Sequence, residues 1–194
     1  AQPRSRGLGD VYKRQIGTNL HRLPYNARNH EYYSEDAVLT AGQGTAYAAA
    51  AMEYGVIIAP KHLAFNDTEI NRTGVSVFMT EQQARENELR GTQGIVENAH
   101  VLGVMTAYNR VGITQDNAHT GLTKNILRNE WGCDGMVITD NVLTQYVNGP
   151  DGVMAGVSIY DAMMSFVTDT LPKYKNDPLS LIHISEPTRP RLIS

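Results

Sequence analysis

The 194-residue sequence is poor in cysteine, in net charge and in long apolar runs, and each shortage excludes a class of protein. Cys133 is the only cysteine, which excludes an internal disulfide and a cysteine-based zinc site and is compatible with a reducing compartment. No stretch approaches eighteen consecutive apolar residues, so no membrane span is expected. The net charge of -3 gives no electrostatic reason to expect nucleic acid or an anionic membrane surface as a partner.

Metal-ligand patterns and internal repeats are missing as well. We expect neither a metal site nor a cofactor, because no metal-ligand spacing is found among the histidines at positions 21, 30, 100, 119 and 183. No repeat of solenoid period and no low-complexity segment occurs. What remains is 41% hydrophobic and 19% charged residues, which is ordinary for a globular protein with one core.

The two ends of the chain are related to each other at the DNA level. Residues 5–15 (SRGLGDVYKRQ) and 179–189 (LSLIHISEPTR) can be encoded by opposite strands of the same DNA, codon by codon. This inverted repeat resembles a sequencing-library adapter translated at both ends of an insert. We therefore expect residues 1–15 and 179–194 to be non-native tails and residues 16–178 to be a piece of a larger gene. The alternative is two natural, disordered basic tails.

Three apolar stretches, at residues 56–60, 101–107 and 135–138, each run directly into polar side chains. They have no helical period, so they are interpreted as buried strands. The polar residues at their ends are Lys61 and His62, Tyr108 and Asn109, and Asp140. In a barrel of parallel strands the carboxyl ends form one active site, so these side chains are predicted to converge.

Helical patterns separate the predicted strands. Residues 41–54 are alanine-rich and are typical of a helix that ends at Gly55. A capping box at residues 80–83 starts a second helix, and residues 122–131 form a third. This alternation is typical of parallel β/α units. Residues 149–156, in contrast, are rich in turn-forming residues.

With these residues laid out, the chain from residue 16 to about residue 164 closely resembles glycoside hydrolase family 3 of the β-glucosidase type. The matching blocks, in order along the chain, are HRLPYNARNHEYYSED, KHLAFNDTEINR, VMTAYNRV, ILRNEWGCDG and GMVITDN. The resemblance implies an α/β fold, an incomplete (β/α)8 TIM-type barrel, at residues 16–178. It also implies a retaining, exo-acting β-glycosidase that hydrolyses the O-glycosidic bond of a β-linked glucoside or related glycoside.

Carried over position by position, the resemblance implies that Asp140 is the catalytic nucleophile, on which a glycosyl-enzyme intermediate forms. It implies that the groups around the bound glycosyl unit are Arg28, Lys61, His62, Arg72 and Tyr108, with Met105 in the pocket wall. The residue types suit this chemistry, because positive charge near Asp140 favours its carboxylate form and cationic groups hydrogen-bond sugar hydroxyls.

Two departures from the family pattern bear on the expected activity. Asn141 stands where the family usually has tryptophan, which puts the stacking surface and the substrate preference in question. In the family the acid/base carboxylate generally comes from a separate α/β sandwich domain, which this sequence does not encode. Glu69 and Glu130 are nearby carboxylates, but nothing in the sequence assigns either that role. We therefore expect the isolated chain to be inactive, with the missing sandwich domain as its partner.

Other interpretations of the same residues remain open from the sequence. Asp140 at a strand end is also typical of a helix N-cap, and His62 is also typical of a packing histidine. Lys61 after a buried strand also fits a Schiff-base aldolase. Asn141 favours a non-catalytic carbohydrate-binding barrel.

Overall fold

The structure is a computed structural model that describes residues 14–141 and 149–161. The predicted tail at residues 179–194 and most of the predicted tail at residues 1–15 lie outside these ranges. Their non-native origin therefore stays a prediction. The first described strand begins at Arg14, two residues before the start predicted for the native segment.

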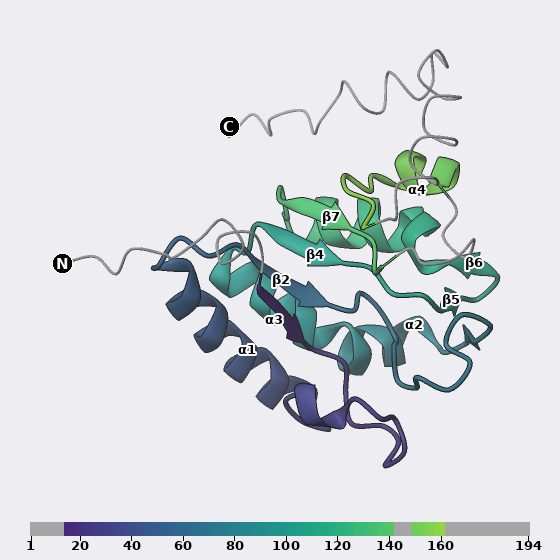
Figure 1. The fold of residues 1–194 in the computed structure, drawn as a ribbon, viewed down its shortest axis with the longest axis horizontal. Helices are drawn as coiled ribbons and strands as arrows, with labels where there is room; N and C mark the ends of the chain where they lie inside the picture. The colour runs from purple at the N-terminus through teal and green to yellow at the C-terminus, as the bar shows by residue number, and fades with distance from the viewer. Residues whose placement is uncertain (1–13, 142–148, 162–194) are drawn as a thin grey trace.

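A parallel sheet forms the centre of the molecule (Figure 1). Its strands are β1 (Arg14–Gly17), β2 (Ile58–Lys61), β4 (Gly103–Met105) and β7 (Met136–Ile138). β1 pairs with β2 so that Gly17 lies opposite Lys61, and β4 pairs with β7. A parallel bridge between Leu63 and Thr106 joins the two pairs. The strand order is thus β1-β2-β4-β7, and all four carboxyl ends lie along one edge.

Helices connect these strands and cover one face of the sheet (Figure 1). They are α1 (Ala37–Met52), α2 (Glu81–Gln83), the π-helical turn η3 (Ala84–Glu88), α3 (Arg90–Ala99) and the π-helix η5 (Gly121–Glu130). The Thr80 half of the predicted capping box is confirmed, because the Thr80 side chain accepts a hydrogen bond from the Gln83 N–H. α1 begins earlier than predicted because Asp36 caps it by accepting from the Leu39 N–H.

Small residues allow α1 and α3 to pack closely. A Cβ atom on Gly44 would lie 2.3 Å from Ile95, and one on Gly94 would lie 2.6 Å from the Ala41 Cβ. Such distances leave no room for a side chain, so the two helices approach at glycine positions. The alanine-rich pattern at residues 41–54 thus has a packing reason as well as a propensity one.

The two faces of the sheet have different surroundings. Ile58, Val104 and Val137 belong to the hydrophobic core beneath the helices. Because strand side chains alternate, Met105 and Ile138 point to the opposite face, which is the interior of the barrel. Four neighbouring parallel strands with helices outside them are part of the predicted (β/α)8 barrel.

The remaining described elements are short. They are η2 (Asn29–Glu31), β3 (Ser76–Val77), β5 (Arg110–Val111), β6 (Thr114–Gln115), η4 (Asp116–Ala118) and α4 (Gly149–Ala155). β5 lies between β3 and β6 in a second, small sheet. None of the helices within residues 14–141 and 149–161 has the length and apolar character needed to cross a membrane.

The turn-rich prediction for residues 149–156 was wrong, since most of them form α4. Tertiary hydrogen bonds stabilise this helix: the Tyr160 hydroxyl donates to the Gly149 carbonyl at 2.6 Å, and the Thr123 hydroxyl donates to the Ala155 carbonyl at 2.6 Å. Such long-range partners override the local preference of glycine and proline for turns.

Candidate active site

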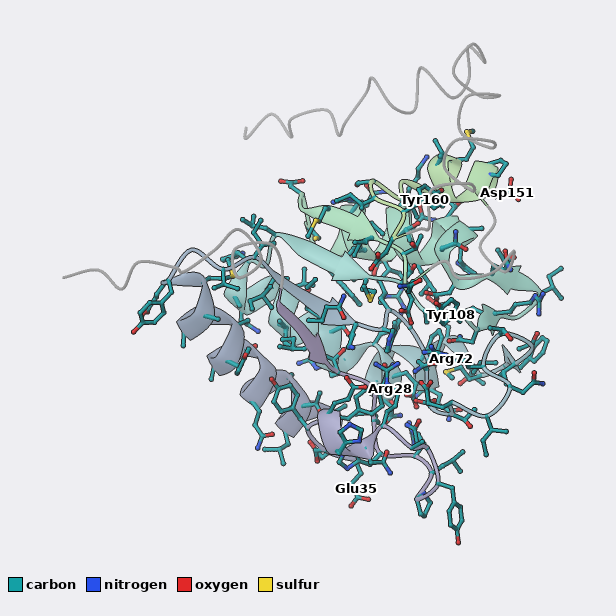
Figure 2. All side chains as sticks on the ribbon, viewed as in Figure 1. Arg28, Glu35, Arg72, Tyr108, Asp151 and Tyr160 are labelled. Atoms are coloured by element: carbon teal, nitrogen blue, oxygen red, sulfur yellow. The ribbon has the colours of Figure 1, made fainter. Side chains whose placement is uncertain are left out.

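Polar side chains from the carboxyl ends of the strands meet beyond the sheet edge. Figure 2 shows Arg28, Arg72 and Tyr108 close together there, apart from Asp151 and Tyr160. We call the ionisable residues gathered there the charged cluster; it consists of Arg28, Glu31, Lys61, His62, Glu69, Arg72 and Asp140. Five of the predicted site residues belong to it.

Asp140 follows β7 and contacts two groups from the β2 side of the site. Its Oδ2 lies 3.2 Å from His62 Nε2 and 3.4 Å from an Arg72 guanidinium nitrogen. Its Oδ1 accepts a hydrogen bond from the Asn141 N–H at 2.7 Å. Asp140 therefore contacts residues that are far away in the sequence. The convergence of the strand ends predicted such contacts.

Electrostatics keep the Asp140 carboxyl ionised. Burial, the strongest influence, by itself raises the pKa of Asp140, but the His62 hydrogen bond, the Asn141 N–H and the Arg72 charge together bring that pKa below its ordinary value. Burial also lowers the pKa of His62, although Asp140 opposes this change. The His62–Asp140 contact thus favours the charged form of each partner, while burial opposes it in both.

Asn19, which follows β1, fixes the position of His62. The Asn19 Oδ1 accepts from the His62 backbone N–H at 2.8 Å and lies 3.3 Å from the ring Nδ1, and the Asn19 amide donates to the His62 carbonyl at 3.1 Å. The His62 side chain is almost fully buried. The peptide bonds Lys61–His62 and Leu63–Ala64 are cis. Sequence reasoning did not identify Asn19, although its place directly after the first strand follows the pattern of the other site residues.

Arg28 joins the loop after β1 to the residues after β2. Its Nε donates to Glu31, and one of its terminal nitrogens lies 3.2 Å from His62 Nε2 and 3.2 Å from Glu69 Oε1. Glu31 also pairs with the Lys61 ammonium at 3.2 Å. Burial by itself raises the pKa of Glu31, but Arg28 and Lys61 bring it below its ordinary value.

Arg72 lies on the loop after β2 and contacts three groups. Beside Asp140, it pairs with Glu69 at 3.2 Å, and its guanidinium lies 4.3 Å from the centre of the Tyr108 ring. Burial raises the pKa of the Tyr108 hydroxyl to about 12, with the Asp140 charge acting in the same direction. Tyr108 thus remains an uncharged wall of the site that stacks against Arg72.

Met105 is the remaining predicted site residue, and it takes part in none of the contacts described so far. It is buried at the end of β4, on the interior face of the barrel, and its carbonyl accepts from the Leu63 N–H at 2.8 Å. This location is compatible with the predicted pocket wall, and that role stays a prediction.

A buried carboxylate fixes the two loops that carry His62 and Tyr108. Asp116 accepts from the Ala64 N–H at 3.0 Å and from the Ala107 N–H at 2.6 Å. Ala64 lies three residues after the end of β2 and Ala107 two residues after the end of β4, so Asp116 ties neighbouring strand ends together. The two hydrogen bonds provide partners for a carboxyl group that is removed from solvent; burial raises its pKa well above the ordinary value, although both N–H donors oppose this change.

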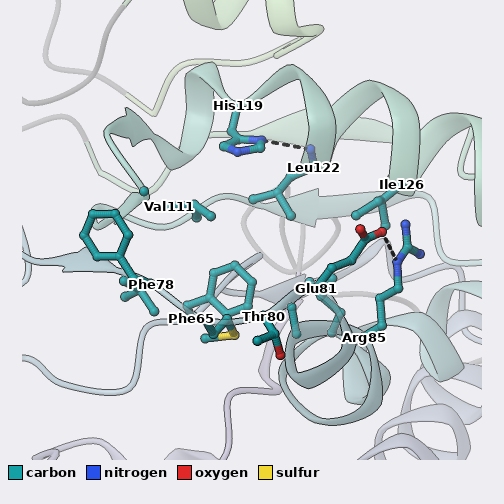
Figure 3. Close-up of a pocket in the computed structure, with 14 residues that line it drawn as sticks. Phe65, Phe78, Thr80, Glu81, Arg85, Val111, His119, Leu122 and Ile126 are labelled. Carbon is teal, nitrogen blue, oxygen red and sulfur yellow. Dashed lines mark hydrogen bonds and ion pairs between the residues drawn. The ribbon is translucent and has the colours of Figure 1, made fainter.

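Glu130, the other carboxylate noted in the sequence, lies elsewhere. It pairs with Arg85 at 2.6 Å on the surface. Arg85 lines the rim of a cavity of about 290 Å³ that we call the apolar groove. Figure 3 shows Phe65, Val111 and Leu122 around this groove, and the residues that line it include none of the charged cluster. Within the described residues, no group of three or more histidine, cysteine or acidic side chains is placed to hold a metal ion.

A family model described as the glycosyl hydrolase family 3 N-terminal domain matches residues 18–163. Among curated relatives, a probable β-glucosidase J of Aspergillus fumigatus is 37% identical over 141 residues, which cover 73% of this chain and 16% of the relative. A β-glucosidase of Rhizobium radiobacter is 38% identical over 122 residues, which cover 63% of this chain and 15% of the relative. The chain thus spans about a sixth of the length of these relatives.

Solved structures give the same result. β-Glucosidase 3B from Thermotoga neapolitana in complex with glucose is 33% identical, with a TM-score of 0.71, over 74% of this chain and 20% of that one. A family 3 β-glucosidase from Bifidobacterium adolescentis is 26% identical, with a TM-score of 0.81, over 91% of this chain and 26% of that one. The family resemblance and the incomplete barrel predicted from the sequence are both confirmed.

Proposed function

This chain belongs to glycosyl hydrolase family 3, and from that premise we propose that it carries the nucleophile half of a retaining β-glucosidase site. The observation that supports this most directly is the contact of Asp140 with both His62 and Arg72. These contacts keep a carboxylate ionised next to groups that hydrogen-bond sugar hydroxyls. The relatives are named β-glucosidases, and one solved neighbour holds glucose, so a β-glucoside is the substrate that we propose.

In the proposed reaction an Asp140 oxygen attacks the anomeric carbon while the bond from that carbon to the leaving oxygen breaks. A glycosyl ester on Asp140 results, and the leaving group departs with the electron pair. An ordinary alcohol must be protonated as it leaves. Glu31 and Glu69 lie beside the site, but each pairs with two cationic side chains, so we assign the proton donor to neither of them. We propose that the donor comes from a sandwich domain of the parent protein.

A glucoside with a good leaving group tests this proposal on the chain itself. Dinitrophenolate needs no proton to depart, so a dinitrophenyl β-glucoside should release up to one equivalent of dinitrophenolate per folded chain in a rapid burst. An alkyl β-glucoside, which needs the acid, should stay intact. Asp140→Asn should abolish the burst, whereas Asp134→Asn, at an exposed position before β7, should keep it.

The outcomes separate this proposal from its main rival. Asn141 is exposed next to Asp140 and favours a non-catalytic carbohydrate-binding barrel. That alternative predicts glucose binding without a burst, and equal binding by the Asp140→Asn variant. Lys61, which the aldolase alternative needs, is bound to Glu31 in an ion pair. A covalent adduct on Lys61 after borohydride treatment with a sugar aldehyde would revive that alternative.

A further inference from the structure

Glu69 lies between the two arginines of the charged cluster. Its Oε1 accepts from a terminal nitrogen of Arg28 at 3.2 Å and from one of Arg72 at 3.3 Å, and its Oε2 lies 3.2 Å from Arg72 Nε. The Asn66 amide donates to the same Oε1 at 2.8 Å. Glu69 is therefore held by three donor side chains and is itself fixed in place.

The two arginines contact different residues, one His62 and the other Asp140. The Arg28 nitrogen that contacts Glu69 also lies 3.2 Å from His62 Nε2, and the Arg72 nitrogen that contacts Glu69 also lies 3.4 Å from Asp140 Oδ2. Because His62 and Asp140 contact each other at 3.2 Å, the five side chains form a closed ring. Glu69 is the ring member opposite the His62–Asp140 contact.

Resting on the proposed function, we propose that Glu69 is a positioning residue that holds Arg28 and Arg72 against His62 and Asp140 and shares their positive charge. Asp140 must be ionised, yet a carboxylate that carries the whole interaction with a guanidinium is a weaker base and a weaker nucleophile. Glu69 takes part of the Arg72 interaction, which leaves Asp140 the electron density to attack. Glu69 acts through the arginines rather than on the sugar.

The titration of Asp140 reports this charge sharing directly. The ionisable groups that face it are His62 after β2, Arg72 and Glu69 on the following loop, Arg28 after β1 and Tyr108 after β4. A carbon-13 NMR titration of the aspartate carboxyl groups, with Asp140 assigned by its loss in Asp140→Asn, measures its pKa. The same preparations give the burst rate with the dinitrophenyl glucoside.

We compare Glu69→Gln with Glu31→Gln, which removes a carboxylate that pairs with Arg28 and Lys61 instead of Arg72. In Glu69→Gln the pKa of Asp140 should fall by about one pH unit, because the Arg72 charge is no longer shared. The burst rate should fall about tenfold. In Glu31→Gln the pKa of Asp140 should change by less than about a third of that amount.

Equal pKa changes in the two variants, or no change in either, would overturn the inference. If Glu69→Gln fails to fold, Glu69→Asp decides the question. It keeps the charge but shortens the side chain, so the pKa of Asp140 should be retained while the burst rate falls. If wild type gives no burst but the pKa response is confined to Glu69→Gln, the proposed function fails and the positioning role of Glu69 stands.

Discussion

The charged cluster and the apolar groove are two regions of the described chain that are built in opposite ways. The groove lies between the segment from Val77 to Arg85, β5 and η5, and its lining is largely apolar. The charged cluster joins side chains from the ends of β1, β2 and β7 through ion pairs. The groove, a cavity of about 290 Å³, thus results from the packing of neighbouring elements. The proposed site is instead identified by charged side chains that converge from different strand ends.

One arginine in each region allows a direct comparison of the charged cluster with the groove. Arg72 pairs with Glu69 and Asp140 in the charged cluster, and Arg85 pairs with Glu81 and Glu130 at the rim of the groove. Both therefore contact two carboxylates, but only Arg72 has a half-buried aspartate at a strand end as one of them. An arginine with two carboxylate partners thus belongs to the proposed site in one place and to the surface in the other.

The largest effect should come from removing the charge of Arg72. Arg72→Met should lower the burst rate about 1,000-fold, which corresponds to ~4 kcal/mol in activation free energy, because Asp140 and Tyr108 lose their common partner. Stopped-flow release of dinitrophenolate measures the rate. Arg85→Met is the matched control and should stay within about twofold of wild type, since exposed ion pairs contribute little. Equal losses in both variants would remove the distinction between the two regions.

The next effect concerns the groove. Leu122 is buried in its wall, and Leu122→Ala should lower the free energy of unfolding by about 3 kcal/mol because it leaves a cavity. Urea denaturation measures this change. The burst rate per folded chain should be unchanged. A lower burst rate at unchanged stability would instead make the groove part of the site.

A third effect tests the loop that carries Glu69 and Arg72. Burial raises the pKa of Asp67 to about 7, and the charge of Glu88 acts in the same direction. Between about pH 4 and pH 7 the unfolded chain has lost this proton while the folded chain keeps it, so this group's contribution to stability is lost as the pH rises through 7.

Asp67→Asn should therefore raise the free energy of unfolding by about 2 kcal/mol at pH 8 and change it little at pH 4. Urea denaturation at both pH values measures the difference. Asp134→Asn, at an exposed position, should show no such pH dependence. A gain from Asp67→Asn of equal size at both pH values would refute the electrostatic explanation.

The smallest effect concerns a helix cap at the groove. Thr80 lines the groove and its side chain accepts from the Gln83 N–H, so Thr80→Ala should cost about 1 kcal/mol of stability. Thr120 provides the control, because it occupies the N-cap position of η5 but its side chain makes no capping hydrogen bond. Thr120→Ala should therefore change the urea midpoint much less. Equal losses would show that helix propensity, and not the cap, decides.

Much of the site was predictable because parallel strands bring their carboxyl ends together. The convergence of the polar residues after the predicted strands could be predicted without knowing the shapes of the loops. These residues are Lys61, His62, Tyr108 and Asp140. Their roles at a bound sugar came from the family resemblance, and they remain proposals. The strand limits were less accurate: β4 is Gly103–Met105, shorter than the apolar run, because Val101 and Ala107 are buried without belonging to the ladder.

The contacts made by Glu31, Glu69 and Asn19 could not be predicted from the sequence for a physical reason. Each contacts a residue from another segment, and loop conformation decides which of many polar side chains comes within 3 Å or so of a given cation. The same holds for Asp116, whose acceptors bind two backbone N–H groups that no pattern identifies. Periodicity predicts which face a residue lies on, but not the partner of its side chain.

Locating the covalent bond tests the central claim most directly. The chain would be incubated with a dinitrophenyl β-glucoside that carries fluorine in place of the hydroxyl at carbon two, which slows hydrolysis of the glycosyl ester. Peptide mass spectrometry would then find the modified residue. The account predicts a glycosyl adduct on Asp140 and none in the Asp140→Asn variant. An adduct on Glu31, on Glu69 or on Glu81 at the groove would contradict it.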